Sequence, residues 1–153
     1  RANANMKQTI TLMAWAFMIL AGLSAHPETA HAEQKMQFGD YEVHYIVLPT
    51  TFLNAKIADK YNLPRGRDRA LVNVSVLNSA LKPIAAQITG QSENLLGQSQ
   101  RLVFTQVTEG DAIYYLALLR HADEEFHRVA LDIQIPGEPL AEIRFQQQMF
   151  WKH

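Results

Sequence analysis

The sequence predicts a mainly β protein, a seven-stranded immunoglobulin-like β-sandwich with one short helix between its first and second strands. Apolar and polar residues alternate in seven segments, which is the pattern of half-buried strands. Gly, Pro, Asn, Asp and Ser, the residues that favour turns, bound these segments. Many short strands with frequent turn signals are typical of a sandwich, and a closed barrel is the alternative.

The seven predicted strands follow one another at short intervals. They span residues 37–48, 70–78, 84–89, 101–108, 112–120, 126–135 and 140–151. The third strand ends at Thr89, or at Leu95 if its alternation continues. In the second strand, Val72, Val74 and Val76 share one face and are predicted to be buried.

One segment after the first strand carries helix signals. Asn54 is suited to the N-cap position, and residues 55–61 can form the helix. Asn62 is suited to a left-handed stop, and Pro64 prevents continuation. We therefore expect a short helix at residues 55–61.

The fifth and sixth strands are separated only by the turn-forming residues 122–125. A tight turn there predicts a hairpin in which opposed residue numbers sum to 247, so that Leu118 faces Val129 on the core side. The same register places Ile113, Tyr115 and Leu119 on the opposite face. Exposed apolar and aromatic residues commonly mark partner-binding surfaces, so these three residues are candidate binding residues. The alternative is that a short helix or loop of the same domain covers them.

The first 32 residues read as a signal peptide. Lys7 precedes an uncharged apolar run over residues 10–23, which is shorter than a membrane span. Ala30-His31-Ala32 has the small-residue spacing of a cleavage site, so we expect cleavage after Ala32 and a single domain over residues 33–153. Residues 1–5 precede Met6, the expected start, and are either non-native or an early start.

Charge and cysteine content exclude several classes of protein. Removing Arg1 and Lys7 from the 14 basic residues and Glu28 from the 15 acidic residues leaves the expected mature chain with a net charge of about −2. Such a balance argues against nucleic-acid binding, which needs a basic face. The chain has no cysteine, so it has no disulfides. No cofactor motif is present, and we predict membrane contact only through the signal peptide before cleavage.

The densest cluster of charge is the segment Arg65-Gly66-Arg67-Asp68-Arg69. Guanidinium groups around a glycine can bind a carboxylate, a phosphate or an anionic glycan. Tyr61 precedes the segment and could supply a stacking surface. A solvated loop with local pairing of Asp68 is the alternative.

The histidines suggest a competing function. His121 and His127 flank an acidic turn, and imidazole with carboxylate suits zinc or copper. The hairpin register sends the two imidazoles to opposite faces, which argues against a shared metal, so no metal ligand is assigned. His44, His121 or His127 could serve a small hydrolase or a metal carrier, but no nucleophile motif accompanies them, and no catalytic residue is assigned.

The segment from Tyr45 to Leu77 is the most characteristic part of the chain. It contains Thr51-Phe52-Leu53 before the helix, Ile57-Ala58 within it and residues 69–76 after it. This pattern resembles a family of uncharacterised exported proteins of Gram-negative bacteria, a domain of unknown function. The resemblance implies a small periplasmic domain and no catalytic residues.

These observations favour a non-enzymatic periplasmic binding or adaptor module for a protein, peptide or anionic ligand. An envelope protein or peptide is the expected partner, bound at the Tyr115 face, at a sheet edge or at the arginine loop. A small hydrolase or metal carrier is the alternative, and a structural subunit of an envelope complex is a third reading. The oligomeric state does not follow from the sequence.

Overall fold

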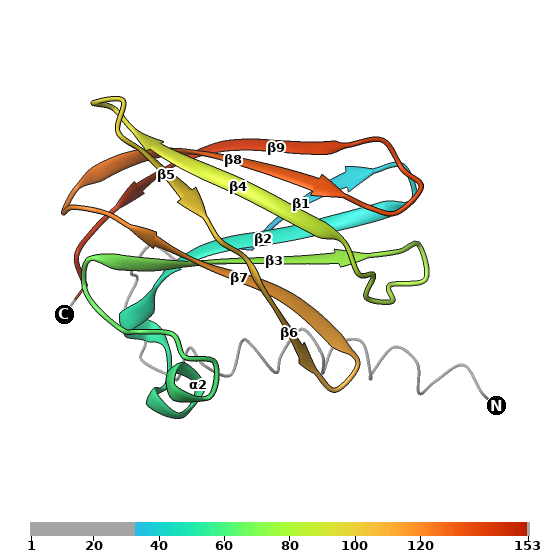
Figure 1. The fold of residues 1–153 in the computed structure, drawn as a ribbon, viewed down its shortest axis with the longest axis horizontal. Helices are drawn as coiled ribbons and strands as arrows, with labels where there is room; N and C mark the ends of the chain where they lie inside the picture. The colour runs from blue at the N-terminus through green and yellow to red at the C-terminus, as the bar shows by residue number, and fades with distance from the viewer. Residues whose placement is uncertain (1–32, 153) are drawn as a thin grey trace.

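The computed structural model describes residues 33–152, in which nine strands form two antiparallel sheets packed face to face (Figure 1). The strands are β1 (Gln34–Phe38), β2 (Tyr41–Pro49), β3 (Arg69–Leu77), β4 (Gln87–Asn94), β5 (Ser99–Leu102), β6 (Thr105–Glu109), β7 (Ala112–Arg120), β8 (Glu125–Gln134) and β9 (Ala141–Met149). A 3-10 turn η1 (Thr50–Phe52) and one short helix α2 (Ala55–Lys60) lie between β2 and β3. The predicted signal peptide lies outside the described residues, and no described helix is long and apolar enough to cross a membrane.

Each sheet contributes one apolar face to a common core. Sheet A has the strand order β1-β2-β3-β7-β6, and sheet B has the order β5-β4-β8-β9. The inner faces meet in a cluster that includes Val43, Val72, Leu119, Leu131 and Ile143, all completely buried. Removing this apolar surface from water is the main driving force for the two-layer packing. The predicted β-rich, two-sheet architecture with one short helix is therefore confirmed.

The strand count is nine rather than seven, because two predicted strands are each two strands. The first is broken by a two-residue turn at Gly39-Asp40, where Gly39 has φ +56°, a conformation that glycine adopts readily. The second is broken at Val103-Phe104, where the chain leaves sheet B after β5 and enters sheet A as β6. The immunoglobulin-like arrangement predicted from the pattern is not confirmed.

The predicted hairpin between the fifth and sixth strands is wrong. Strand β7 pairs with β3 and β6 in sheet A, whereas β8 pairs with β4 and β9 in sheet B. The connection at residues 121–124 therefore passes from one sheet to the other. A short acidic turn can join two layers as well as two paired strands, and alternation along each strand does not distinguish these cases.

The face assignment of β7 is also wrong as a consequence. Tyr115 and Leu119 are 4% and 0% exposed and belong to the main core, where the Tyr115 hydroxyl accepts a hydrogen bond from the Ala86 N–H at 2.8 Å. Ile113 is half-buried against the same core. The predicted apolar patch at these three residues is therefore not a surface.

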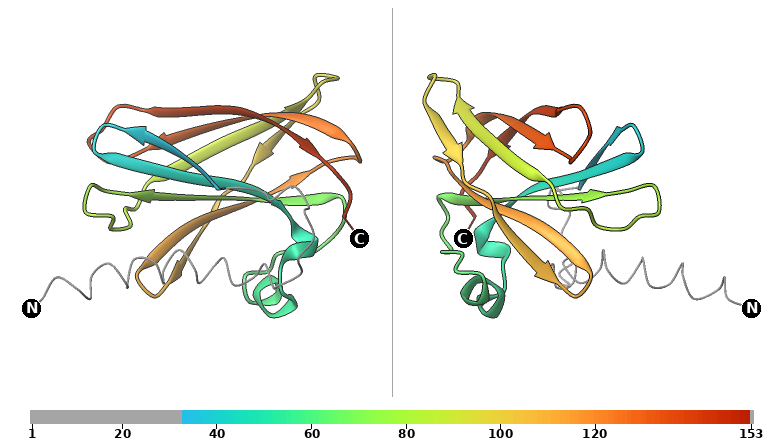
Figure 2. Two further views of the ribbon diagram at one scale, coloured as in Figure 1. Left: turned by 180° about the vertical axis from the view of Figure 1, so that it is seen from behind. Right: turned by 45° about the vertical axis from the view of Figure 1, so that its right-hand side comes forward.

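The outer face of sheet A carries a second, smaller apolar cluster beneath α2. Leu53, Ala58, Leu71, Val107 and Leu116 form its buried centre. The helix begins as predicted, because the Asn54 side chain accepts a hydrogen bond from the Lys56 N–H at 2.8 Å. It is followed by Asn62 with φ +52°, the left-handed stop that the sequence predicts. Figure 2 shows α2 outside the sandwich, on the side where β6 lies.

Gly90 in β4 lies where sheet B packs closely against Phe104 of the crossover, so a substitution at this position tests that packing. A Cβ atom at this position would lie 2.9 Å from Leu131 Cδ2, 3.1 Å from Phe104 Cε2 and 3.2 Å from the Ala130 carbonyl oxygen. We expect Gly90→Ala to lower the free energy of unfolding by about 1–3 kcal/mol, because overpacking displaces these neighbours. Urea unfolding measures the change, and Thr89→Ala, an exposed neighbour, is the control. Equal stability of the two variants would contradict this packing.

Candidate functional site

A groove of about 420 Å³ lies on the outer face of sheet A, beside α2. One wall is the segment Tyr61–Leu63 that follows the helix, and the opposite wall is β6 with the crossover that precedes it. The floor comes from β7. The lining residues are mostly apolar: Tyr61, Asn62, Leu63, Arg101, Val103, Thr105, Val107, Leu116, Ala117 and Leu118. Its volume is within the usual range for small-molecule sites.

Two polar groups in this groove have no partner within residues 33–152. The Tyr61 hydroxyl is buried and makes no hydrogen bond. The exposed guanidinium of Arg101, the one charged side chain of the lining, makes no ion pair or hydrogen bond with another described residue. The unpaired Tyr61 hydroxyl costs stability, whereas the exposed Arg101 guanidinium is open to a ligand in the groove.

In the arginine loop (Arg65–Arg69), each of the three arginines makes a different contact. Arg65 donates to the Thr51 carbonyl at 3.0 Å, the Arg67 guanidinium lies 4.2 Å from the centre of the Trp151 ring, and Arg69 Nε lies 3.4 Å from Asp68 Oδ1. The three guanidinium groups are therefore engaged separately. Anion binding by this loop, with Tyr61 beside it, stays a prediction.

Thr50 fixes the base of the arginine loop. Its hydroxyl lies 2.9 Å from the Gly66 carbonyl and 3.0 Å from the Arg69 carbonyl, and it accepts from the Gly66 N–H at 3.1 Å. Thr50 is completely buried, so this is a strong constraint on a loop that is otherwise at the surface. It holds the chain between α2 and β3 in one conformation.

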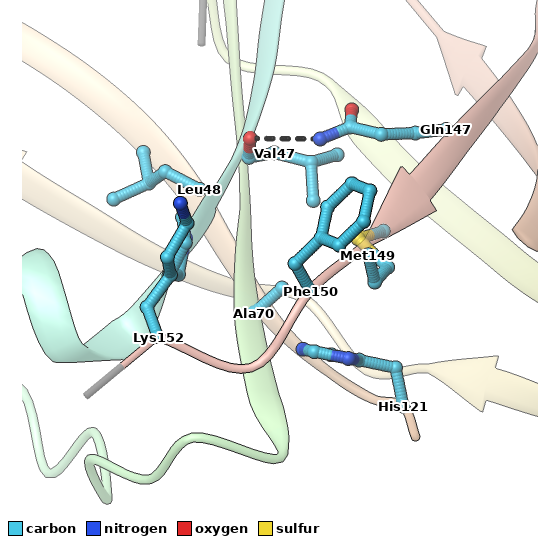
Figure 3. A pocket seen from close by; sticks show the side chains of 9 residues that line it. Val47, Leu48, Ala70, His121, Gln147, Met149, Phe150 and Lys152 are labelled. Atoms are coloured by element: carbon cyan, nitrogen blue, oxygen red, sulfur yellow. Dashed lines mark hydrogen bonds between the residues drawn. The ribbon is translucent and has the colours of Figure 1, made fainter. Parts of the chain in front are cut away.

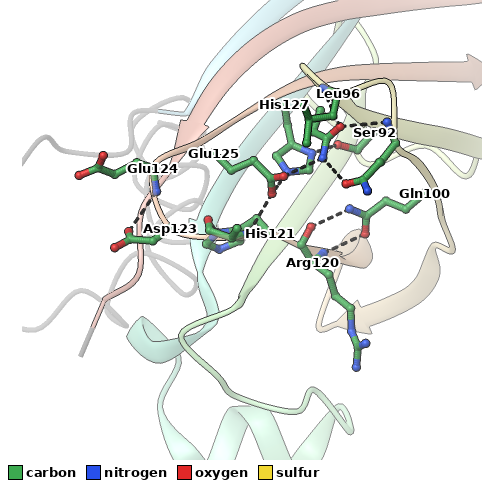
Figure 4. Close-up of polar contacts among 12 residues, drawn as sticks. Ser92, Leu96, Gln100, Arg120, His121, Asp123, Glu124, Glu125 and His127 are labelled. Carbon is green, nitrogen blue, oxygen red and sulfur yellow. Dashed lines mark hydrogen bonds and ion pairs between the residues drawn. The ribbon is translucent and has the colours of Figure 1, made fainter.

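A buried chain of hydrogen bonds lies between β4 and β8 on the inner face of sheet B (Figure 4). Ser92 Oγ is 2.6 Å from His127 Nδ1, and His127 Nε2 is 2.8 Å from Glu125 Oε2. Glu125 also accepts from the Ala122 N–H and from Asn94 Nδ2, at 2.8 and 2.7 Å. Burial alone would raise the pKa of Glu125, but the hydrogen bonds from Ala122, His127 and Asn94 together lower it below its ordinary value.

This network has the components of a nucleophile, a base and an orienting carboxylate. With Glu125 ionised and the imidazole neutral, Nε2 donates to the carboxylate and Nδ1 accepts from the Ser92 hydroxyl. However, Ser92 and His127 are only 0% and 2% exposed. Ser92 and His127 are closed to solvent, whereas Glu125 is half-buried, and the network supports the β4–β5 hairpin through Asn94, which accepts from the Leu96 and Gln98 N–H groups.

His121 is also buried, at 7% exposure, so neither it nor His127 is the surface histidine that the sequence suggested. His121 lines a cavity of about 20 Å³ with Met149 and Phe150, which is room for about one water molecule (Figure 3). Its Nδ1 bonds the Ala122 carbonyl at 2.8 Å. Within residues 33–152, no three or more His, Asp or Glu side chains are placed to hold a metal ion.

His44 on the outer face of β2 contacts two carboxylates. Nδ1 hydrogen-bonds Glu33, and Nε2 lies 3.1 Å from Glu42 Oε2. The hydrogen bond to Glu33 is the main reason that the pKa of His44 is raised above 6.5, and burial opposes it. The hydrogen bond from His44 likewise lowers the pKa of Glu42. The protonated imidazole therefore ties the start of the described chain to sheet A.

The sequence does not reveal the groove or the Ser92–His127 contact. The groove joins residues 61–63 to residues 101–118, and the Ser92–His127 contact depends on the register of β4 against β8, in which Asn94 faces His127. Neither pairing has a local sequence signal. The break at Val103-Phe104, where Val103 is 70% exposed, is likewise seen only in the structure, because the sequence predicts one continuous strand over residues 101–108.

Comparison with known proteins gives one family and a wider structural likeness. The model of a domain of unknown function, DUF4426, matches residues 35–152. A crystal structure of a DUF4426 family protein from Pseudomonas aeruginosa is 31% identical, with a TM-score of 0.72, and covers 79% of this chain and 97% of its own. No curated protein matches the sequence.

Two structures of FetP from uropathogenic Escherichia coli share the fold at lower identity. A copper-bound variant is 13% identical, with a TM-score of 0.57 over 79% of this chain and 97% of its own. FetP as isolated after expression in the periplasm is 14% identical, with a TM-score of 0.56 over 80% and 96%. At this identity the likeness shows only that the fold is shared.

The His44 contacts predict a pH-dependent contribution to stability. Because the folded pKa is raised, protonated His44 stabilises the fold fully below the unfolded value of 6.5 while Glu33 and Glu42 stay ionised, and this stability is lost as pH rises through the folded pKa. We expect His44→Gln to lower the melting temperature at pH 5.5 and to change it little at pH 9. A difference of equal size at both values would exclude the ionic contact.

Proposed function

This chain belongs to the DUF4426 family, a family of unknown function, and we propose that it is a non-enzymatic, exported binding module that holds an apolar ligand bearing a carboxylate in the groove beside α2. The groove offers apolar walls and one cation. Such a combination favours an amphipathic, anionic ligand. Export is supported by the predicted signal peptide.

The observation that carries this proposal is the unpaired guanidinium of Arg101 beside apolar walls. Arginine side chains near a sheet commonly pair with a carboxylate of the same protein, as Arg144 does with Asp132 at 2.9 Å. Arg101 has no such partner among the described residues. A guanidinium offers two parallel N–H donors, which match the two oxygens of a carboxylate.

A carboxylate fits this groove better than a phosphate. Arg101 is the only charged side chain among the lining residues, so the groove can balance a single negative charge. The remaining surface, including Val103, Leu116 and Leu118, matches an aliphatic or aromatic portion of the ligand.

The fold shared with FetP is not evidence that this chain binds copper. Its variant is described as copper-bound, but the described residues of this chain provide no set of three or more His, Asp or Glu side chains suited to a metal. His44 directs both ring nitrogens at carboxylates, and His121 directs Nδ1 at a carbonyl. A metal-carrier function therefore has no observation in its favour.

A hydrolase is the second candidate function, favoured by the hydrogen-bonded series Ser92, His127 and Glu125. The distances of 2.6 and 2.8 Å are those of a nucleophile activated by a base. Catalysis would require the β4–β5 hairpin to open, because Ser92 is completely buried in the closed structure. The groove lining contains none of these three residues.

Dodecanoate tests the groove, because it combines an aliphatic chain with one carboxylate. We expect it to shift the methyl NMR signals of Val103, Leu116 and Leu118, and we expect Arg101→Gln to weaken binding about tenfold, the effect of losing one charge-assisted hydrogen bond. Arg128→Gln, on the outer face of sheet B, is the matched control and should bind like the wild type. Equal binding of dodecanol and dodecanoate would contradict a carboxylate site at Arg101.

Ser92→Ala separates a structural from a catalytic role of the buried series. The change leaves His127 Nδ1 buried without a partner, so we expect a loss of about 1–3 kcal/mol in the free energy of unfolding. We expect unchanged hydrolysis of p-nitrophenyl acetate, since the hydroxyl is sealed. Ser99→Ala, an exposed serine on β5, is the control for both measurements. Hydrolysis that disappears only in Ser92→Ala would establish the hydrolase instead.

A further inference from the structure

Within residues 33–152, no strand pairs with the outer edge of either sheet on the groove side. Strand β6 pairs only with β7, and β5 pairs only with β4. The crossover at Val103-Phe104 joins these two edge strands, so the free edges follow one another along the same side of the molecule (Figure 1). An edge strand presents main-chain N–H and C=O groups that can pair with another strand.

Strand β6 lacks the features that usually protect an edge. Its sequence, Thr-Gln-Val-Thr-Glu, contains no proline or lysine, and its only charge, Glu109, is at its end and pairs with Lys60 at 2.6 Å. The other edge strand of sheet A, β1, carries Lys35 in its interior. The edge strand β9 carries Arg144, which donates to the Leu131 and Ile143 carbonyls. Among the sheet edges, β6 is thus well suited to accept a strand.

The groove lies directly against this edge. Thr105 and Val107 of β6 line one wall, and Tyr61–Leu63 line the other. A strand paired with β6 would run about 4.8 Å from it. Every second side chain of such a strand would point to the outer face of sheet A, the face that carries Val107, Leu116 and the groove.

We propose that the ligand is an extended peptide that pairs with the free edge of β6, places alternate apolar side chains in the groove and directs an acidic side chain to Arg101. This inference rests on the proposed function and specifies the class of ligand. Main-chain pairing supplies affinity, and the groove and Arg101 supply the preference for sequence.

Selection from a display library of random twelve-residue peptides tests the ligand class. We expect the chain to enrich sequences with apolar residues at alternate positions and an acidic residue at one end of that pattern. Binding of the enriched peptide should fall at least about tenfold in Arg101→Gln and stay unchanged in Arg128→Gln. Absence of enrichment, or enrichment without an acidic residue, overturns the proposal.

A second measurement tests strand pairing itself. N-methylation of alternate residues of the enriched peptide removes main-chain donors without changing its side chains. We expect one N-methyl pattern to abolish binding, the complementary pattern to be tolerated, and hydrogen exchange of the Gln106 and Thr108 amides to slow when the unmodified peptide binds. Equal tolerance of both patterns, or unchanged exchange in β6, overturns strand pairing.

The dodecanoate titration separates failure of this inference from failure of the proposed function. If dodecanoate binds in the groove but no peptide is enriched, the groove is a carboxylate site and its ligand is not an extended peptide. If neither binds, both proposals fail. Thr105→Trp, which fills the groove from an exposed position of β6, should prevent both kinds of binding while the melting temperature stays near that of the wild type.

Discussion

Strand β7 is apolar on both faces, so both faces must be covered by other parts of the protein. This requirement determines what packs against sheet A. Tyr115 and Leu119 point into the sandwich, where sheet B covers them. Leu116 and Leu118 point outward, where sheet B cannot reach. Burial of large apolar side chains contributes about 1.5–3 kcal/mol each, so the outer face requires a second covering layer. The segment between β2 and β3 supplies it as η1 and α2.

That covering layer is short, and its incompleteness creates the groove. Helix α2 has only six residues, which is too short to be stable without tertiary contacts. Thr50, which precedes the helix, hydrogen-bonds the loop that follows it. Lys60, the last residue of the helix, forms an ion pair with Glu109 of β6. Beyond the helix, residues 61–63 and β6 lie on opposite sides of the groove, whose floor includes Leu116 and Leu118. One wall of the groove and the cover of the second cluster are thus the same segment.

Alternation predicted the strands well and their partners poorly, for a physical reason. The predicted strand at residues 112–120 has the same bounds as β7, because the turn-forming residues on either side of it are local sequence signals. Which strand lies alongside depends on contacts that are distant in sequence. Leu118 and Val129 were expected to face each other in one sheet, but they lie in different sheets because the turn between them crosses the layers. The exposed patch at Tyr115 failed for the same reason.

The Ser92–His127 network and the groove at Arg101 differ in how completely their polar groups are hydrogen-bonded within the protein. This difference indicates which of the two is suited to a ligand. Ser92, His127, Glu125 and Asn94 hydrogen-bond one another, with all but the half-buried Glu125 closed to solvent, so they fix the β4–β5 hairpin. The Arg101 guanidinium is exposed and has no partner among the described residues, so it is free to pair with the carboxylate that we propose as part of the ligand. Strand β6 borders the same groove, and its main-chain groups on the edge away from β7 have no strand partner among the described residues.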